Sequence, residues 1–388
     1  MRYRLKDIFD LQMGKTPARQ NMKYWDKSDC KWISIADLSR SEKYISNTKE
    51  KISDIAVKET GIRVIPANTV IMSFKLSIGK VAITADNMYS NEAIMAFNDK
   101  HVVEMLPEYI FYMFKYMRWD SGSNNAVMGK TLNKATISEI EIDICSIKKQ
   151  QEIVAILDKM DNILSNKYKN IYLLDELVKA RFIEVFGDML LNSKSWREIR
   201  LDSVADIVSG ITKGRKIKSA EIYEVPYMAV SNVKNGYIDW TKVKTIMATK
   251  EEIKRYQLLP NDVLMTEGGD PDKLGRGAII KSPPNNCIHQ NHIFRVRLNE
   301  EILPIYFEYY LQQIKAKRYF LKCSKQTTGI ASINMKQLMA LPVLIPDMES
   351  QKTFAKFTEQ ADKSKAVIEK SLKELETLQA SLMQKYFS

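Results

Sequence analysis

The chain has 388 residues, of which 45% are hydrophobic and 27% are charged, and it carries a formal net charge of +12. This length and composition are typical of two or three globular domains, and no apolar run approaches the roughly 18 residues that a membrane span needs. The amphipathic N-terminus lacks the apolar stretch of a signal peptide, and the four cysteines are too scattered to suggest a metal site or a disulfide framework. We therefore expect a cytoplasmic protein without membrane attachment.

Residues 1–147 contain short apolar runs separated by turn-forming residues. Runs such as 70–74 and 81–84 are rich in β-branched and aromatic residues and have the length of strands. A helical stretch near 107–118 opens on Pro107, which a helix accepts in its first turn. The pattern predicts a first mixed α/β globule over 1–147.

The next segment, 148–187, is expected to form one long helix. Its apolar residues recur every three or four positions, and no Gly or Pro interrupts it between Lys148 and Phe186. Such a helix would extend for roughly 57 Å at 1.5 Å per residue. A second α/β globule is expected over 195–347, and a second long helix over 348–388.

The second half of the chain repeats the first. The matched positions include Gly14 with Gly210, Ile65-Pro66 with Leu259-Pro260, and Gln151 with Gln351. A period of about 195 residues is far longer than the 20 to 50 residues of solenoid units, so a duplicated domain is indicated. Two amphipathic helices in one chain can bury their apolar faces on each other as an antiparallel pair. The fold class is therefore α/β (α+β), with two mixed α/β globules separated by two long antiparallel coiled-coil helices in a pseudo-twofold repeat. Under that symmetry the globules lie at opposite ends of the pair.

The positive charge is concentrated outside the expected helices. Residues 148–188 carry seven Lys or Arg against seven acids, and residues 349–388 carry seven against six. The two segments together contribute +1, which leaves about +11 for the globular parts. This distribution is typical of a protein that binds a polyanion, although a generically basic soluble protein would also show it.

The order globule–helix–globule–helix resembles the DNA specificity subunits of type I restriction-modification systems. Several matching stretches carry this resemblance: Leu5 to Gly14-Lys15-Thr16-Pro17 with Leu201 to Gly210, Trp32-Ile33 before Asp37 with Pro226-Tyr227 before Asn232, the Ile-Pro and Val-Ile-Met-Ser runs followed by Ile-Gly, and a strand leading into Gln150-Gln151-Glu152-Ile153 or Glu349-Ser350-Gln351. The chain departs from the family at Asn91-Glu92 and Gln290-Asn291, where Asn-Gln is frequent, and at Ile345-Pro346-Asp347-Met348, which replaces a Pro-Pro-Leu type segment.

The resemblance implies that each globule is a target recognition domain that reads one half of a bipartite, asymmetric site on double-stranded DNA. The long helices would set the gap between the half-sites and dock two methyltransferase subunits. Those subunits would carry S-adenosylmethionine and methylate adenine, while separate restriction subunits translocate and cut DNA. This chain would then hold no cofactor of its own and catalyse no reaction.

The candidate DNA-binding residues are cations and amides in loops, because Lys and Arg neutralise phosphates and amides can pair with adenine edges. They are Lys15, Arg19, Lys75, Lys80, Asn124, Asn125, Lys130 and Lys134 in the first copy, and Lys213, Arg215, Lys216, Lys273, Arg276, His289, Gln290, Lys325 and Gln326 in the second. Solvated lysines in tight turns are the alternative at each position. The candidate partner-binding residues are Tyr172 and Leu173, two apolar positions on the first long helix.

No catalytic motif is complete. The Gly-Lys-Thr triplets at Gly14 and Gly129 lack the glycine that a phosphate-binding loop needs five residues earlier, since Phe9 and Asn124 stand there. His289 and His292 have no further ligands nearby, so a zinc site is not supported. A specificity subunit of a type IIB-like system and a coiled-coil scaffold that does not bind DNA remain as alternatives.

Two results are expected from the DNA-binding interpretation. Arg215→Ala should lower DNA affinity and flatten its salt dependence, because a phosphate contact releases counterions. Lengthening or shortening both long helices by one turn should change the gap tolerated in the target.

Overall fold

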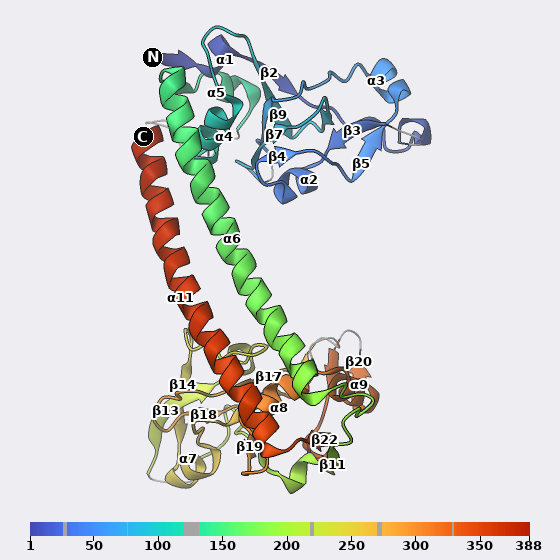
Figure 1. The fold of residues 1–388 in the computed structure, drawn as a ribbon, viewed down its shortest axis with the longest axis vertical. Coiled ribbons are helices and arrows are strands. Elements are labelled where there is room, and N and C mark those ends of the chain that lie inside the picture. Colours follow the sequence, from blue (N-terminus) through green and yellow to red (C-terminus); the bar gives the residue numbers. More distant parts are fainter. Residues whose placement is uncertain (26–28, 76, 120–131, 218–220, 270–273, 328–329) are drawn as a thin grey trace. The chain divides into compact units, whose positions relative to one another are not determined.

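The computed structural model describes the chain except for residues 26–28, 76, 120–131, 218–220, 270–273 and 328–329. The chain forms two compact units: unit 1 is Met1–Tyr168 with Glu369–Ser388, and unit 2 is Lys169–Ile368. Each unit contains one α/β globule with the adjoining parts of two long helices (Figure 1).

The globule of unit 1 is built on a five-stranded sheet with the strand order β2-β9-β6-β7-β4. Its strands are β2 (Phe9–Met13), β4 (Tyr44–Ile45), β6 (Val70–Ser73), β7 (Val81–Thr84) and β9 (Ile94–Asp99). Neighbouring strands are antiparallel except for β4, which runs parallel to β7. β6 and β7 are buried along their full length, which explains why their sequences are mostly apolar and do not alternate.

Two smaller sheets and several short helices complete the globule of unit 1. The sheets β5-β3-β8 and β1-β10 contain β1 (Arg2–Arg4), β3 (Cys30–Ile33), β5 (Glu50–Ile52), β8 (Tyr89–Ser90) and β10 (Glu141–Asp143). The helices are α1 (Leu5–Ile8), η1 (Met22–Tyr24), α2 (Ile35–Arg40), α3 (Asp54–Thr60), α4 (Pro107–Tyr116) and α5 (Lys134–Ser138). The proline predicted to open a helix stands in the first turn of α4.

The described residues of unit 2 form four sheets, with the strand orders β12-β19-β15-β17, β14-β13-β18, β11-β22 and β16-β21-β20. The strands are β11 (Arg197–Arg200), β12 (Ala205–Ser209), β13 (Tyr223–Met228), β14 (Lys244–Ala248), β15 (Val263–Thr266), β16 (Gly268–Gly269), β17 (Gly277–Ile279), β18 (Ile288–His289), β19 (Ile293–Leu298), β20 (Lys325–Thr327), β21 (Ile330–Ser332) and β22 (Pro342–Ile345). The short helices are η2 (Leu201–Ser203), η3 (Val230–Asn232), α7 (Lys250–Tyr256), α8 (Pro304–Leu311), α9 (Ile314–Cys323) and α10 (Met335–Met339).

The two globules share one topology. The order β2-β9-β6-β7 in unit 1 corresponds to β12-β19-β15-β17 in unit 2, and β5-β3-β8 corresponds to β14-β13-β18. In both three-stranded sheets the central strand pairs in parallel with one neighbour and antiparallel with the other. The mixed α/β class and the internal repeat that the sequence predicts are thus confirmed.

Two 40-residue helices, α6 (Ile147–Phe186) and α11 (Met348–Phe387), follow the two globules in the chain (green and red in Figure 1). The unit boundary lies inside each helix, after Tyr168 in α6 and after Ile368 in α11. Each helix is therefore divided between the two compact units, whereas the sequence predicted separate spacers over 148–187 and 348–388. No helix in the described part of the chain is long and apolar enough to cross a bilayer.

In unit 1 the first half of α6 packs against the last part of α11. The amide of Gln379 donates a hydrogen bond to Asp161 at 2.6 Å, and Tyr168 donates one to Glu376. Met383 on α11 belongs to the same apolar core as the strands of the five-stranded sheet. As the residue number rises along α6, the residue number of its contact partner on α11 falls, so the two helix segments are antiparallel.

In unit 2 the same relation holds between the second half of α6 and the first part of α11. Lys365 and Asp175 form an ion pair at 2.9 Å, and the rings of Phe182 and Phe354 lie 5.3 Å apart. Phe182 also stacks on Tyr306 of α8, which inserts the helix into the globule's core. Within each unit, the antiparallel pairing predicted from sequence is confirmed.

A buried glutamine at the start of each long helix ties that helix to its globule. Gln150 and Gln351 are both fully buried, and their side-chain oxygens accept hydrogen bonds from the backbone N–H of Leu106 and Leu303, respectively, at 2.9 and 2.8 Å. Each amide nitrogen donates to two backbone carbonyls. The sequence comparison that matched Gln151 with Gln351 was therefore wrong by one residue, because Gln151 is exposed.

Candidate DNA interface

Each globule has a loop that opens on a glycine and passes very close to the end of the β8 or β18 strand. We call residues 14–19 and 210–216 the glycine loops. A Cβ atom on Gly14 would lie 2.2 Å from the carbonyl oxygen of Ser90, and one on Gly210 would lie 1.9 Å from that of His289. The next residue in each loop donates its N–H to the same carbonyl, at 2.8 Å from Lys15 and 3.0 Å from Ile211. Only glycine fits this approach, which fixes the start of both loops.

An aromatic side chain on the central strand of the small sheet also fixes each glycine loop. The indole N–H of Trp32 on β3 donates to the carbonyl of Lys15 at 3.1 Å, and the hydroxyl of Tyr227 on β13 donates to that of Ile211 at 2.9 Å. Both rings are almost completely buried. The loops are therefore rigidly mounted on their globules, which is what a recognition surface requires.

Asp37 and Asn232, which carry part of the family resemblance, stabilise the following turn. The Asp37 carboxylate accepts from the backbone N–H and hydroxyl of Ser34 at 3.0 and 2.6 Å, and Asn232 accepts from the N–H of Ala229 at 3.0 Å. Both side chains are buried. Their role is to cap the turn that leaves β3 or β13.

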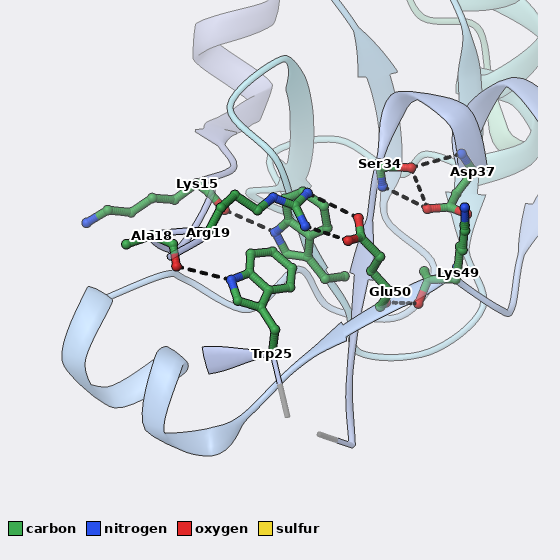
Figure 2. Close-up of polar contacts among 10 residues, drawn as sticks. Lys15, Ala18, Arg19, Trp25, Ser34, Asp37, Lys49 and Glu50 are labelled. Carbon is green, nitrogen blue, oxygen red and sulfur yellow. Dashed lines mark hydrogen bonds and ion pairs between the residues drawn. The ribbon is translucent and has the colours of Figure 1, made fainter. Parts of the chain in front are cut away.

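In unit 1 the glycine loop places Arg19 in a cage of aromatic rings. Its guanidinium lies 4.0 Å from the ring centre of Trp25 and 5.0 Å from that of Trp32, and it forms a two-pronged ion pair with Glu50 at 2.5 and 3.1 Å (Figure 2). The Trp25 indole donates to the carbonyl of Ala18 at 3.2 Å. The Arg19 side chain nevertheless remains 51% exposed. It is oriented by the cage and accessible to a ligand.

Two further cations lie beside this loop. Thr16 donates a hydrogen bond to Glu92, which lowers the pKa of that carboxyl, and the charges of Lys75 and Arg19 lower it further. Lys75, which the sequence offered as a DNA-binding candidate in a different loop, therefore lies within electrostatic reach of the glycine loop. Lys15 is also exposed, with its ammonium donating to the carbonyl of Thr60 at 2.5 Å.

Lys80 and Lys134 lie elsewhere in unit 1. Lys80 is exposed and lines a cavity of about 690 Å³ with residues of α4 and α6, among them Asp158. Lys134 opens α5, and its charge lowers the pKa of Asp10, although the hydrogen bond from Arg63 lowers it more. Asp10 stands near the start of β2, whereas the glycine loop follows the end of that strand. The structure thus does not gather these two lysines with Arg19.

The glycine loop of unit 2 uses its arginine differently. Arg215 donates to both oxygens of Glu252 on α7, at 2.6 Å for the Nε bond, and to the carbonyl of Met247 at 3.0 Å. This pairing raises the pKa of Arg215 and lowers that of Glu252. The Arg215 side chain is 19% exposed. It connects the loop to α7, which weighs against the phosphate contact predicted from sequence, whereas Lys213 and Lys216 in the same loop are exposed.

The prediction that His289 contacts DNA is wrong. The side chain is fully buried, with its ring nitrogens 3.1 Å from the carbonyl of Tyr256 and 3.3 Å from that of Val208. Burial lowers its pKa to about 4, so the ring is neutral at physiological pH. The prediction rested on the polar residues that follow His289 in the sequence. Strand β18 ends at His289, so His289 is still buried and the chain reaches the surface only after it.

The surface after β18 is polar. Gln290 is half-buried, and its backbone N–H donates to the carbonyl of Met228 at 2.9 Å. The backbone N–H of Asn291 donates to the carbonyl of Ile211 in the glycine loop at 3.1 Å. His292 is 57% exposed and contacts Glu267 through Nδ1 at 2.5 Å. The stretch that the sequence indicated therefore does border the glycine loop, through the backbone of His289 and Asn291 and not through the His289 side chain.

The remaining candidates fall outside this grouping or outside the described residues. Arg276 is half-buried and lines a cavity of about 250 Å³ with Glu308 of α8. Lys325 and Gln326 belong to β20, but their side chains lie outside the described part of the structure. Residues outside the described ranges are Asn124, Asn125, Lys130 and Lys273.

Sequence reasoning missed Trp25, Glu50 and Glu267. The one available signal was the pair of tryptophans, Trp25 and Trp32, close to a basic loop, because arginine stacks on indole rings. Which acid meets which cation depends on strand register, which the sequence does not reveal. Among the described residues, no group of three or more His, Cys, Asp or Glu side chains is placed to bind a metal ion.

The two partner-binding candidates lie on the part of α6 that belongs to unit 2. Tyr172 is 62% exposed and Leu173 is 49% exposed, and Leu177 and Ile183 on the same helix are also about half exposed. A helix whose apolar side chains reach solvent at several positions offers a surface to another protein.

Known proteins share this arrangement. A family model described as the type I restriction modification DNA specificity domain matches residues 1–173 and 193–377. The type I restriction enzyme MjaIX specificity subunit of Methanocaldococcus jannaschii is 28% identical over 324 residues, covering 78% of this chain and 74% of the relative. The EcoKI specificity subunit of Escherichia coli is 26% identical over 168 residues, which are 42% of this chain and 36% of that subunit.

Solved structures show the same fold. The S subunit of a type I restriction-modification system from M. genitalium aligns with a TM-score of 0.55 and 16% identity, over 100% of this chain and 96% of that one. A chain from a study of complex assembly and conformational transition of the type I R-M system aligns with a TM-score of 0.63 and 14% identity, over 99% and 96%. Since the family model matches both halves of the sequence, and both units repeat one framework, this chain belongs to the family of type I restriction-modification DNA specificity domains.

Proposed function

We propose that this protein is the DNA-recognition subunit of a type I restriction-modification complex, in which each unit reads one half of a bipartite, asymmetric site on double-stranded DNA. One observation carries this proposal. The two units mount their glycine loops through equivalent backbone contacts but present different side chains, an exposed Arg19 in unit 1 and the pair of an exposed His292 with a half-buried Glu267 in unit 2. Two unlike surfaces on one framework suit a target with two unlike halves.

The distribution of charge supports DNA as the ligand. Nearly all of the net charge of +12 lies outside the long helices. Exposed cations border both glycine loops: Lys15, Arg19, Lys75, Lys213 and Lys216. Cations in such positions neutralise phosphates and give an affinity that falls steeply with salt.

We further propose that α6 and α11 set the number of unread base pairs and dock two methyltransferase subunits. Tyr172 and Leu173 are exposed apolar residues on a helix with balanced charge, and exposed apolar residues of this kind favour contact with another protein. In this assembly the methyltransferase subunits carry S-adenosylmethionine and methylate adenine, separate restriction subunits cut DNA, and this chain catalyses nothing. The complex acts in the cytoplasm.

Selection from randomised duplexes tests the proposal. The full chain, with methyltransferase subunits present, is incubated with the duplex pool at about 0.1 M salt, and the bound duplexes are sequenced. The expected motif has two constant parts separated by a fixed number of unconstrained positions. Retention of the pool without enrichment would overturn sequence-specific recognition, and absence of any retention would favour the scaffold alternative.

A helix-length variant tests the spacing role. Four residues, about one turn, are inserted into both α6 and α11 so that their pairing is preserved. The expected result is the same two constant parts at a changed separation. An unchanged separation would show that the helices do not measure the gap.

The docking role is tested by Leu173→Asp, which places a charge on the proposed contact surface without opening a core. The variant should lose co-purification with the methyltransferase subunits. Lys179→Asp, at an exposed position six residues farther along the same helix, serves as the control for negative charge, and it changes the charge by two units where Leu173→Asp changes it by one. Equal loss in both variants would contradict a specific contact at Leu173.

A further inference from the structure

The position occupied by Glu267 in unit 2 is occupied by Phe74 in unit 1. Each residue follows the corresponding strand, β15 or β6, and donates its backbone N–H across to the turn before β19 or β9. The acceptor is the carbonyl of His292 for Glu267 and of Ala93 for Phe74, at 3.0 Å in both cases. The two pairs, Glu267 with His292 and Phe74 with Ala93, are therefore equivalent in the framework.

Their chemistry is opposite. Phe74 is 1% exposed and Ala93 is 7% exposed, so unit 1 fills this place with buried apolar side chains. In unit 2 the side chains of Glu267 and His292 are 33% and 57% exposed and are joined by a 2.5 Å hydrogen bond. The framework needs no charge here, since unit 1 forms it without one. The polar pair in unit 2 must have another use.

The contacts of His292 define its hydrogen-bonding state. Nδ1 faces the Glu267 carboxylate, and Nε2 lies 3.2 Å from the side-chain amide nitrogen of Asn291. With hydrogen on Nδ1, the ring donates to Glu267 through Nδ1 and accepts from Asn291 through Nε2, so one tautomer satisfies both contacts. This arrangement fixes the orientation of the carboxylate.

The pair borders the proposed DNA-binding loop. The backbone of Asn291 donates to Ile211 of the glycine loop, and the carbonyl of Glu267 accepts from Ile333 next to β21 at 2.9 Å. Lys213 and Lys216 lie farther along the same loop and are exposed. A carboxylate beside a polyanion is repelled by phosphates, so it is useful only where a base edge offers it a hydrogen-bond donor.

We propose that Glu267, positioned by His292, accepts a hydrogen bond from the amino group of a cytosine in the half-site read by unit 2. Among the donors in the major groove, cytosine N4 is the usual partner of a carboxylate, whereas adenine is usually paired by Asn or Gln. The oxygen acceptors of guanine and thymine would be repelled at the same place. This inference rests on the proposed function of the glycine loops.

The test compares the motif bound by the parent chain with that of Glu267→Gln, using the full chain with methyltransferase subunits and a randomised duplex pool. The parent should prefer cytosine about tenfold or more at one position of one half-site. In the variant that preference should fall to about twofold or move to adenine, which glutamine reads. The other half-site, read by unit 1, should remain unchanged and is the internal control.

His292 is tested as a positioning residue by two substitutions. His292→Ala should weaken the cytosine preference several-fold, because the carboxylate loses its fixed orientation. His292→Asn should restore most of it, since its amide can replace the Nδ1–H donor. Lys213→Ala in the neighbouring glycine loop is the control, expected to lower affinity for all sequences and to reduce the salt slope by about one without altering the motif.

Two outcomes separate failure of this inference from failure of the proposed function. If the parent selects a bipartite motif and Glu267→Gln selects the same one, Glu267 does not read a base, and the proposed function stands. If the parent selects no motif, the proposed function fails and the inference fails with it. Thermal unfolding of each variant identifies any that is misfolded. If Glu267→Gln is misfolded, the comparison of His292→Ala with His292→Asn tests whether Glu267 reads a base.

Discussion

The two glycine loops begin alike and end differently. Arg19 in unit 1 and Arg215 in unit 2 both pair with a glutamate, but the Arg19 pair is 51% and 38% exposed, whereas the Arg215 pair is 19% and 24% exposed. Exposed ion pairs contribute about 0–1 kcal/mol, so a phosphate can replace Glu50 at little cost. Displacing Glu252 would break a part-buried network. A duplicated framework thus preserves backbone geometry and leaves each side chain free to take a different role.

The largest effect is expected where the two units are most alike. Gln150→Ala removes three hydrogen bonds that a fully buried side chain makes to the backbone of its globule, and the same holds for Gln351→Ala. Because most of these bonds are only partly shielded from water, each contributes about 1 kcal/mol, and each variant should lose about 2–3 kcal/mol of unfolding free energy. Urea unfolding followed by circular dichroism measures this loss.

The neighbouring Gln151 provides the control for that comparison. Gln151→Ala changes an exposed position and should alter the unfolding free energy by less than about 0.5 kcal/mol. If Gln151→Ala were as damaging as Gln150→Ala, the equivalence of Gln150 and Gln351 would be refuted.

A second difference between the units lies in their cores. Phe111 on α4 is matched by Glu308 on α8, and both side chains are buried. Burial raises the pKa of Glu308 to about 7, although the N–H of Ile279 donates to it at 2.9 Å. The folded state binds the Glu308 proton more tightly than the unfolded state does. Protonation of Glu308 therefore makes its full contribution to the free energy of unfolding below about pH 4.5, and this contribution is lost as the pH rises toward 7.

Glu308→Gln should remove that pH dependence. The neutral amide keeps an oxygen for the Ile279 N–H, so the variant should match the parent near pH 4 and exceed its stability by about 2–3 kcal/mol at pH 8. Comparing the urea midpoints of variant and parent at both pH values cancels contributions from other groups, such as His289. A constant difference across this range would show that Glu308 is already charged in the folded state.

The sequence predicted the fold better than the site, for a physical reason. Strand burial, helix periodicity and the repeat depend on apolar patterns that any reader of the sequence can count, and these predictions were confirmed. The availability of a charged side chain depends on register and packing. Nothing near His289 in the sequence indicates that it ends a buried strand, and nothing near Arg215 indicates that α7 brings Glu252 to it. Charged residues in a loop therefore indicate a surface segment. Whether each charged side chain can contact a ligand depends on its hydrogen-bond and ion-pair partners in the folded protein.

Arg215→Ala tests whether Arg215 stabilises the folded protein or contacts DNA. The substitution removes a charge-assisted contact to Glu252 and a hydrogen bond to Met247, so a loss of about 1–2 kcal/mol of unfolding free energy is expected. The slope of log affinity for DNA against log salt should not change. A slope reduced by about one would restore the phosphate contact that the sequence indicated.

Arg19→Ala should have the smallest effect on stability and a distinct effect on binding. Its pair with Glu50 is exposed, so unfolding should change by less than about 1 kcal/mol. If Arg19 exchanges Glu50 for a phosphate, DNA affinity should fall about fivefold, roughly 1 kcal/mol, for every sequence, and the salt slope should fall by about one. Arg63→Ala is the matched control, because Arg63 also forms an exposed ion pair, with Asp10, but away from the glycine loop. Equal slopes for both variants and the parent would mean that the aromatic cage presents Arg19 to no phosphate. The contrast between the two loops would then be one of packing alone.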